Sequence, residues 1–167
     1  MLRFTVLSSA VVLALLVATV GLAQNPPDVA RVGLEIEGAL WGFFDKVTHI
    51  GSRHEVVEHV VVDPDTGEEY TEKIPGRYEV FDITLERLVS SDMDGWDWRQ
   101  MVVDGLIDEA RIDDVGLIFY NSSNEEVGRF QLERCWPSEI ESNAPTTDGL
   151  AVERMVLTCE GVSRVSK

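Results

Sequence analysis

The chain has 167 residues, of which 44% are hydrophobic and 26% are charged, and its formal net charge is −16. A length of this order suits one domain, because domains cluster at roughly 100–150 residues. So large an acidic excess excludes binding of DNA, RNA or anionic lipid through a basic patch as the main activity. Two cysteines make neither a four-ligand zinc site nor a disulfide framework. The composition is that of a small, acidic globular domain.

The N-terminus has the three-part pattern of a secretory signal peptide. Met1-Leu2-Arg3 carries one positive charge, Phe4 to Ala23 is uncharged and apolar, and Gly21-Leu22-Ala23 offers small residues at a cleavage site. We therefore expect residues 1–23 to be a signal peptide, residues 24–31 to be a linker, and the mature protein to be secreted without a stable membrane anchor. A permanent anchor is the alternative, because about 20 apolar residues can span a bilayer.

After the linker, alternation of apolar and polar residues predicts strands. Val32, Leu34 and Ile36 alternate with polar residues or glycine, and residues 81–86 repeat the pattern. Between them, His54–Val62 and Glu69–Ile74 are expected to pair as a protruding hairpin. The intervening Asp63-Pro64-Asp65-Thr66-Gly67 has the Pro, Asp and Gly residues that a tight reversal needs.

One helix is predicted, from Asp94 to Asp104. Ser91 or Asp92 can cap its start, and Gly105 lies just past its end. An ordinary surface helix buries an arc only a little over 100° wide. Here the apolar arc is wider, so we expect the helix to be covered on more than one side. The arc consists of Trp98, Met101, Val102 and Leu106, extended by Trp96, Val103 and Ile107.

The C-terminal third reads as further strands. A turn at Asn121-Ser122-Ser123-Asn124 joins Val115–Tyr120 to Val127–Glu133, and a polar loop, Ser142 to Gly149, precedes a last strand, Ala151 to Glu160. Several of these strands are apolar on both faces, so each face must pack against another part of a protein. Either the helix and a second sheet of the same chain provide this packing, or neighbouring copies of the chain do.

The two cysteines are expected to be free. If residues 130–141 and 150–160 form a hairpin around the polar loop, position 135 falls opposite position 155, and Cys159 lies about four residues further along. That offset exceeds the Cα separation of about 4.4–6.8 Å that a disulfide tolerates. Both would then be small buried side chains. A bulge or another register is the alternative, and export would permit a Cys135–Cys159 bond.

No catalytic, cofactor or metal site is predicted, and we expect no enzyme activity. His54 and His59 lie an odd number of residues apart on a strand, so they point to opposite faces, and His49 has no partner. Asp92-Met93-Asp94-Gly95 resembles a calcium loop, but Val103 stands where that loop needs an acidic residue. The hairpin-tip acids could gather a weak calcium ion, although a solvated turn is the default. No motif of a catalytic nucleophile appears. Among the thirty acidic residues, nothing in the sequence distinguishes one pair of carboxylates that could serve in acid–base catalysis.

Six short motifs, in order, resemble the tail tube proteins of phages with contractile tails, the family related to the Hcp tube protein of type VI secretion. The motifs are Pro75-Gly76-Arg77, similar to a turn before a strand; Ile83–Arg87; Trp96-Asp97-Trp98-Arg99-Gln100 with Val102-Val103-Asp104-Gly105; the hairpin of Ala110–Tyr120 and Glu125–Phe130; Cys135-Trp136-Pro137; and Val152–Leu157 with Glu160-Gly161. The resemblance implies a mainly β fold, a β-sandwich or barrel-like domain over residues 32–162 with one flanking α-helix, followed by a C-terminal tail at 163–167.

The same resemblance implies a structural subunit that assembles with itself into six-membered rings, stacked as a hollow tube. A tube cap, baseplate or sheath proteins are the further partners it suggests. Expected interface residues are Asp63, Asp65, Glu68 and Glu69 in the long loop, and Trp96, Val103 and Ile107 on the helix. Tail tube subunits normally lack a signal peptide, so the N-terminus favours an exported, extracellular tube over a virion tail. A secreted β-sandwich binding module that does not polymerise is the alternative.

Overall fold

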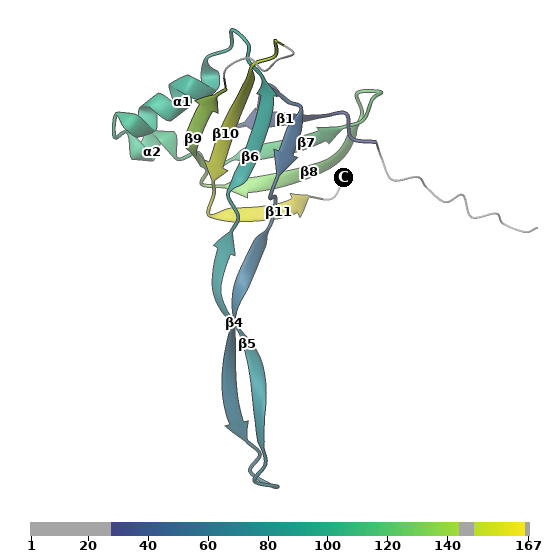
Figure 1. The fold of residues 1–167 in the computed structure, drawn as a ribbon, viewed down its shortest axis with the longest axis vertical. Coiled ribbons are helices and arrows are strands. Elements are labelled where there is room, and N and C mark those ends of the chain that lie inside the picture. The colour runs from purple at the N-terminus through teal and green to yellow at the C-terminus, as the bar shows by residue number, and fades with distance from the viewer. Residues whose placement is uncertain (1–27, 144–148, 166–167) are drawn as a thin grey trace, which may run out of the picture.

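The computed structural model describes residues 28–143 and 149–165 as a two-sheet body, a long hairpin and two helices (Figure 1). The helices are α1 (Asp94–Val103) and α2 (Ile107–Ala110). The strands are β1 (Arg31–Ile36), β2 (Ala39–Phe44), β3 (Lys46–Thr48), β4 (Ser52–Val62), β5 (Glu69–Val80), β6 (Ile83–Leu88), β7 (Val115–Tyr120), β8 (Glu126–Glu133), β9 (Trp136–Ser142), β10 (Val152–Thr158) and β11 (Gly161–Val165). The predicted mainly β fold is confirmed.

Two antiparallel sheets form the body. The first has the strand order β11-β8-β7-β1-β2 and the second has the order β3-β6-β10-β9. Sequence patterns did not predict β2, β3 or β11, because Ala39–Phe44 lacks alternation and the other two strands are short. Ser163–Val165, within the expected C-terminal tail, belongs to β11.

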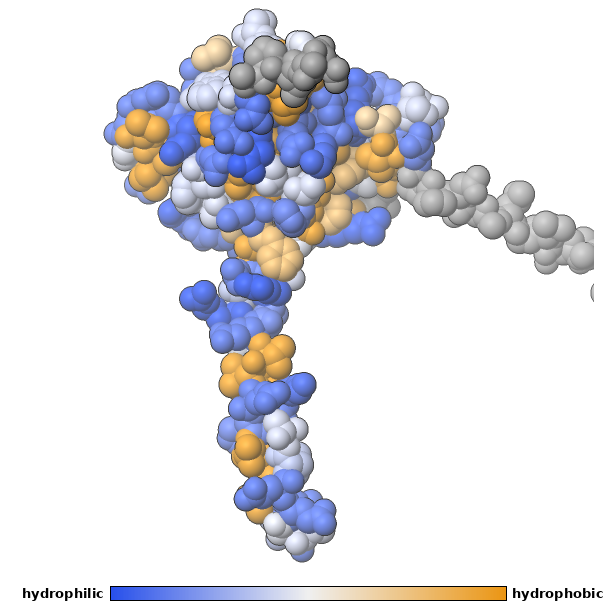
Figure 2. Space-filling view, in the orientation of Figure 1, coloured by the Kyte–Doolittle hydropathy of each residue, from blue (hydrophilic) through white to orange (hydrophobic). Residues whose placement is uncertain are grey.

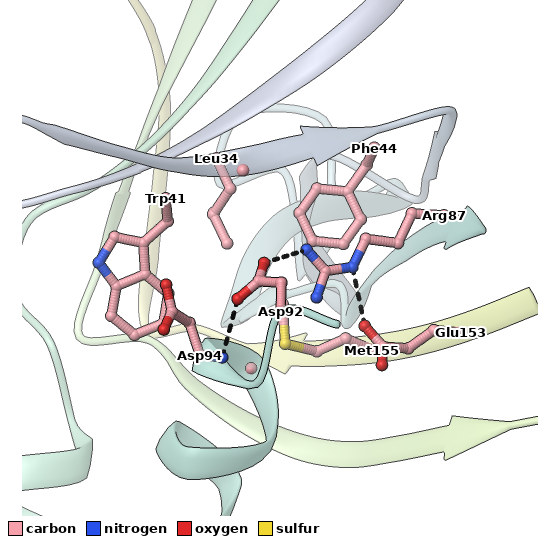
Figure 3. A pocket seen from close by; sticks show the side chains of 10 residues that line it. Leu34, Trp41, Phe44, Arg87, Asp92, Asp94, Glu153 and Met155 are labelled. Atoms are coloured by element: carbon pink, nitrogen blue, oxygen red, sulfur yellow. Dashed lines mark hydrogen bonds and ion pairs between the residues drawn. The ribbon is translucent and has the colours of Figure 1, made fainter. Parts of the chain in front are cut away.

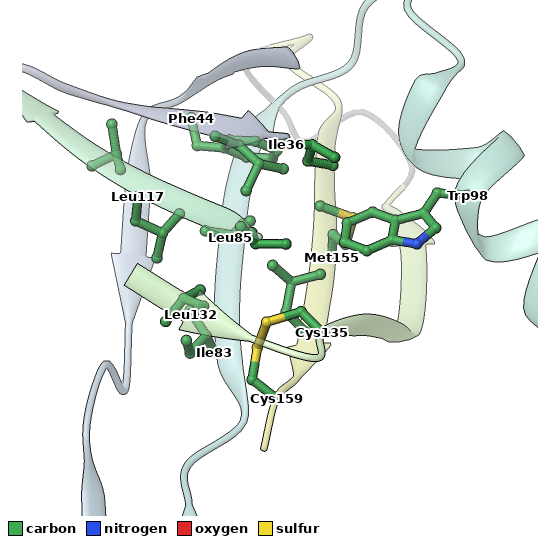
Figure 4. Close-up of a cluster of buried hydrophobic side chains, with 14 of the residues drawn as sticks. Ile36, Phe44, Ile83, Leu85, Trp98, Leu117, Leu132, Cys135, Met155 and Cys159 are labelled. Atoms are coloured by element: carbon green, nitrogen blue, oxygen red, sulfur yellow. A yellow bond between two sulfur atoms is a disulfide. The ribbon is translucent and has the colours of Figure 1, made fainter. Parts of the chain in front are cut away.

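The core lies between the two sheets. Its composition confirms the alternation predicted for β1. Val32, Leu34 and Ile36 are buried against apolar residues of β6, β7 and β10 (Figure 4). Helix α1 closes one end by inserting Trp98, whose ring meets that of Trp41 edge-to-face at 5.5 Å. Burial of so many large side chains is the main source of stability in a domain of this size.

The prediction of free thiols is wrong: Cys135 and Cys159 form a disulfide, with Cα atoms 4.2 Å apart (Figure 4). The reason is register. Thr158 pairs with Trp136, and a bulge lies between Val156 and Leu157, so the closing hairpin is shifted about four residues from the expected pairing. Cys135 and Cys159 lie one residue beyond that pair, where β8 passes to β9 and β10 passes to β11.

The β4–β5 hairpin extends far beyond the body, as predicted, and turns at Asp63–Gly67 (Figure 1). Pro75-Gly76-Arg77 does not form a turn before a strand. It lies inside β5, where the register shifts opposite residues 54–56. A Cβ atom on Gly76 would approach Val57 Cγ2 to 2.8 Å, so the bulge requires a glycine there.

Helix α1 begins and ends close to its predicted limits, with Gly105 in the left-handed conformation at φ +81° just past its end. The predicted cap differs: Met93 holds the cap position without a side-chain bond, and Asp92 accepts the N–H of Asp94 at 3.0 Å. In the part of the chain that the structure describes, no helix has the length and hydrophobicity to cross a bilayer.

Candidate functional site: exposed apolar surfaces

The hairpin exposes apolar side chains on both of its faces. Val60 is 61% exposed on one face, while Val57 and its cross-strand neighbour Ile74 are exposed on the other. Figure 2 shows these apolar bands alternating with polar ones along the hairpin. Within the described residues β4 and β5 pair only with each other. A two-stranded ribbon alone in water is marginally stable at best, so this one is suited to being covered.

The four acids expected at an interface gather at the hairpin tip. Asp63 has a structural task there, because its Oδ1 accepts the N–H groups of Asp65 at 2.8 Å and Thr66 at 3.0 Å. These bonds, the Thr66 bond foremost, hold the pKa of Asp63 below its usual value. Asp65, Glu68 and Glu69 are exposed. No group of three potential ligands in the described chain is arranged to hold a metal ion.

A second exposed apolar surface lies on α1 and α2, at the far end of the molecule from the hairpin tip (Figures 1 and 2). Val103 is 62% exposed and Ile107, the first residue of α2, is 43% exposed. Met101 and Leu106 are also exposed. The wide apolar arc predicted for this region is thus only partly covered within one subunit: Trp98 is buried, whereas Val103 and Ile107 are not.

Trp96, the third helix residue expected at an interface, is half-buried and anchored inside the subunit. Its Nε1–H donates to Glu153 Oε2 at 2.7 Å. Glu153 is only 4% exposed, and its other oxygen accepts Arg87 Nε–H at 2.8 Å. Arg87 Nη1–H also donates to Asp92 Oδ2 at 2.7 Å, which joins β10, β6 and the start of α1 (Figure 3).

This network, together with the bond from the N–H of Asp94, accounts for the Asp92 carboxylate better than a calcium loop does. Burial alone would lower the pKa of Arg87, but its bonds to Asp92 and Glu153 raise it above the ordinary value. The cavity beside these groups measures only about 10 Å³, room for about one water molecule. Sequence reasoning missed Arg87 and Glu153. The sequence feature that could have identified them is a charged residue at a position where the alternation of the strand predicts a buried side chain.

Open strand edges complete the exposed surfaces. In the described chain β2 and β11 are the edges of the five-stranded sheet, and β3 and β9 are those of the four-stranded sheet. Edge strands present unpaired N–H and C=O groups that favour pairing with another chain. On β2, Leu40 and Phe43 add exposed apolar side chains beside that edge.

Solved structures share this fold. A chain of the PVC sheath-tube complex of an extracellular contractile injection system aligns with a TM-score of 0.64 at 18% identity, over 87% of this chain and 95% of that one. A chain of the anti-feeding prophage cap aligns with a TM-score of 0.65 at 17% identity, over 86% and 93%. A type six secretion system protein gives 0.59 at 8% identity, over 81% and 83%. Such low identities show the fold alone.

No curated protein matches the chain. The family described as T4-like virus tail tube protein gp19 does match, over residues 33–163. That range runs from β1 to β11 and includes the hairpin, the helices and both sheets. The protein therefore belongs to the family of T4-like virus tail tube proteins.

Proposed function

We propose that this tail tube subunit assembles with itself into rings, six-membered by analogy with its family, which stack into a hollow tube. The observation that carries the proposal is the hairpin, which exposes valines on both faces and has no partner from the described body. Copies of the same chain would cover it. The open edges of β2 and β11 would join the five-stranded sheets of adjacent subunits, which satisfies their backbone groups.

The interface residues proposed for this assembly belong to two surfaces. Asp63, Asp65, Glu68 and Glu69 at the hairpin tip would contact adjacent subunits or the next ring. Val103 and Ile107, with the anchored Trp96 in the first turn of α1, would form a contact on the helical side. The exposure of Val103 and Ile107 in the isolated subunit supports this assignment. Cap, sheath and baseplate proteins are the further partners proposed for the tube.

We further propose that the subunit is exported and that the tube forms outside the inner membrane. Two observations support export. Residues 4–23, which lie outside the described part of the chain, have the composition of a signal peptide. The Cys135–Cys159 disulfide is of a kind that persists in oxidising compartments and is rare in the cytosol.

Negative-stain microscopy of the mature chain, starting at Gln24, tests the assembly. Stacked rings or tubes are expected. Featureless small particles at all concentrations would instead favour a secreted module that does not polymerise. A Val103→Glu variant tests the helical contact, because a carboxylate on an exposed site changes folding stability little but costs several kcal/mol when buried unpaired in an interface.

For Val103→Glu, oligomer size reports assembly and circular dichroism reports folding, so the two measurements together separate a lost contact from an unfolded subunit. We expect a folded protein of reduced size. Val29→Glu, at an exposed valine just before β1, is the matched control and should assemble normally. If Val103→Glu assembles as well as the control, the helical face is not an interface.

A further inference from the structure

The molecule has an open apolar groove between the helices and the turn that joins β1 to β2. Its volume is about 370 Å³, and its walls include Trp41, Trp98, Met101 and Ile112. Glu37 and Glu109 stand at its rim, and no cation of the described chain pairs with either carboxylate. The exposed Leu106 and Ile107 continue the apolar surface along the helices beside it. Such a groove suits a segment with an apolar side chain flanked by positive charge.

The end of β11 is a segment of that chemistry. Val165 is 41% exposed, and the neighbouring Arg164 is exposed and forms no ion pair within the described residues. Lys167, outside the described residues, adds a second positive charge three residues after Arg164 in the sequence. Arg164 lies near the end of β11, a strand that within the described residues pairs on one side only, in a chain with a net charge of −16.

The groove and the strand end cannot meet within one subunit. Figure 1 places α1 and α2 on one side of the body and the end of β11 on the opposite side. Two complementary surfaces on opposite sides of a molecule produce head-to-tail contacts between copies, which close as a ring or continue as a filament. Opposite charges across such a contact fix its register and disfavour wrong partners.

We infer that the basic end of β11, with Arg164 and Val165, docks into the acidic-rimmed groove of the next copy and forms the ring contact. The inference rests on the proposed self-assembly and names the two surfaces that meet. Val165 would cover the apolar floor of the groove. Arg164 would approach Glu109 and Glu37, which gives these three charges the partners they lack in the isolated subunit.

Charge exchange between the two surfaces tests the inference. Arg164→Glu and Glu109→Arg each place like charges at every proposed contact, so each variant alone should lose assembly at least several-fold at low salt. An equimolar mixture of the two variants restores opposite charges wherever they alternate around a ring. Assembly of the mixture, and of the double variant, should therefore return to near the wild-type level.

Asp113→Arg is the matched control, because Asp113 is exposed and lies outside the groove lining. Circular dichroism checks that every variant is folded. If the two single variants change assembly in opposite directions, net charge rather than contact governs it, and the inference fails. It also fails if either single variant assembles normally or if the mixture is not restored. Absence of tubes in the wild type would instead overturn the proposed function itself.

Discussion

Glu153 shows how single residues determine the position of helix α1. It lies on β10 opposite Arg87 of β6, and both side chains belong to the edge of the buried region. Taking these charges out of water is costly, so each must be fully hydrogen-bonded. Arg87, Trp96 and Asp92 supply those bonds. These bonds therefore fix the position of α1 on β6 and β10, and with it the direction of its exposed face.

The first prediction concerns Asp92. The N–H of Asp94 and then the Arg87 guanidinium lower its pKa below the usual value, so the carboxylate stabilises the fold above its unfolded pKa of about 4. Asp92→Asn should reduce the free energy of unfolding by about 1 kcal/mol at pH 7. The loss should disappear as the pH falls through the folded pKa, where wild-type Asp92 is protonated too.

Urea unfolding at pH 7 and at pH 3 measures this difference. Asp113→Asn removes an exposed acid that makes no hydrogen bond or ion pair among the described residues, and it should leave stability unchanged at both values. An Asp92→Asn effect of equal size at pH 7 and pH 3 would show that the charge is not responsible.

At the scale of elements, the corner formed by four strands is held covalently. The disulfide joins the β8–β9 passage to the β10–β11 passage, and Cys135 also exchanges two backbone bonds with Ile112. Glu160 adds an N–H bond to Glu133 O at 2.9 Å. This corner positions β11, the edge strand on which the proposed ring contact depends.

The second prediction is that replacing both cysteines destabilises the subunit. The bond joins residues 24 apart, for which the chain-entropy model gives about 3 kcal/mol. The Cys135→Ser, Cys159→Ser double variant should lower the unfolding midpoint accordingly. A reducing agent should have the same effect on the wild type and none on the variant. Intact-mass analysis of the wild type, alkylated under denaturing and non-reducing conditions, should show no added alkyl group. Two added groups would show that Cys135 and Cys159 are free thiols and would contradict the disulfide.

The hairpin is the element that a single subunit leaves least supported. Its turn is well determined by Asp63, but β4 exposes valines on both faces, and Ile74 of β5 is exposed as well. Native edge strands and ribbons usually carry charges or bulges that block association. This ribbon has one register shift, at Gly76, and carries exposed ion pairs such as Lys73–Glu58, but apolar bands remain exposed between its polar ones (Figure 2). Such a hairpin is suited to a permanent partner rather than to solvent.

At the scale of the whole molecule, the net charge bears on assembly and on the proposed export. With a net charge of −16, copies of the chain repel one another, and salt screens that repulsion with a Debye length of about 8 Å at physiological ionic strength. In the proposed tube, apolar contacts at the hairpin and at the helices would have to outweigh this repulsion. Export of separate subunits would delay those contacts until the chain leaves the cytoplasm.

The third prediction is that the mature protein begins near Gln24. The basis is the small residues Gly21 and Ala23 after an apolar stretch. N-terminal sequencing of protein recovered from outside the inner membrane should read from that position. Recovery of Met1 on soluble cytoplasmic protein would contradict export.

The sequence by itself determined the family and most of the strands. Alternation fixed β1 and β6, turn residues fixed the hairpin and the β7–β8 turn, and Gly105 fixed the end of α1. These features are local, because periodicity and turn chemistry act over a few residues. The ordered motifs added the tail tube resemblance, which the family match confirms.

Only the tertiary structure decided how distant strands align and which side chains stay uncovered. The closing hairpin is shifted by about four residues and a bulge, and that register brings Cys135 to Cys159. The pairing of β10 with β6 sets Glu153 opposite Arg87, and the packing of the subunit leaves Val103 and several valines of β4 exposed. Register depends on contacts between segments far apart in the chain, whereas a sequence pattern reports only the period of each segment.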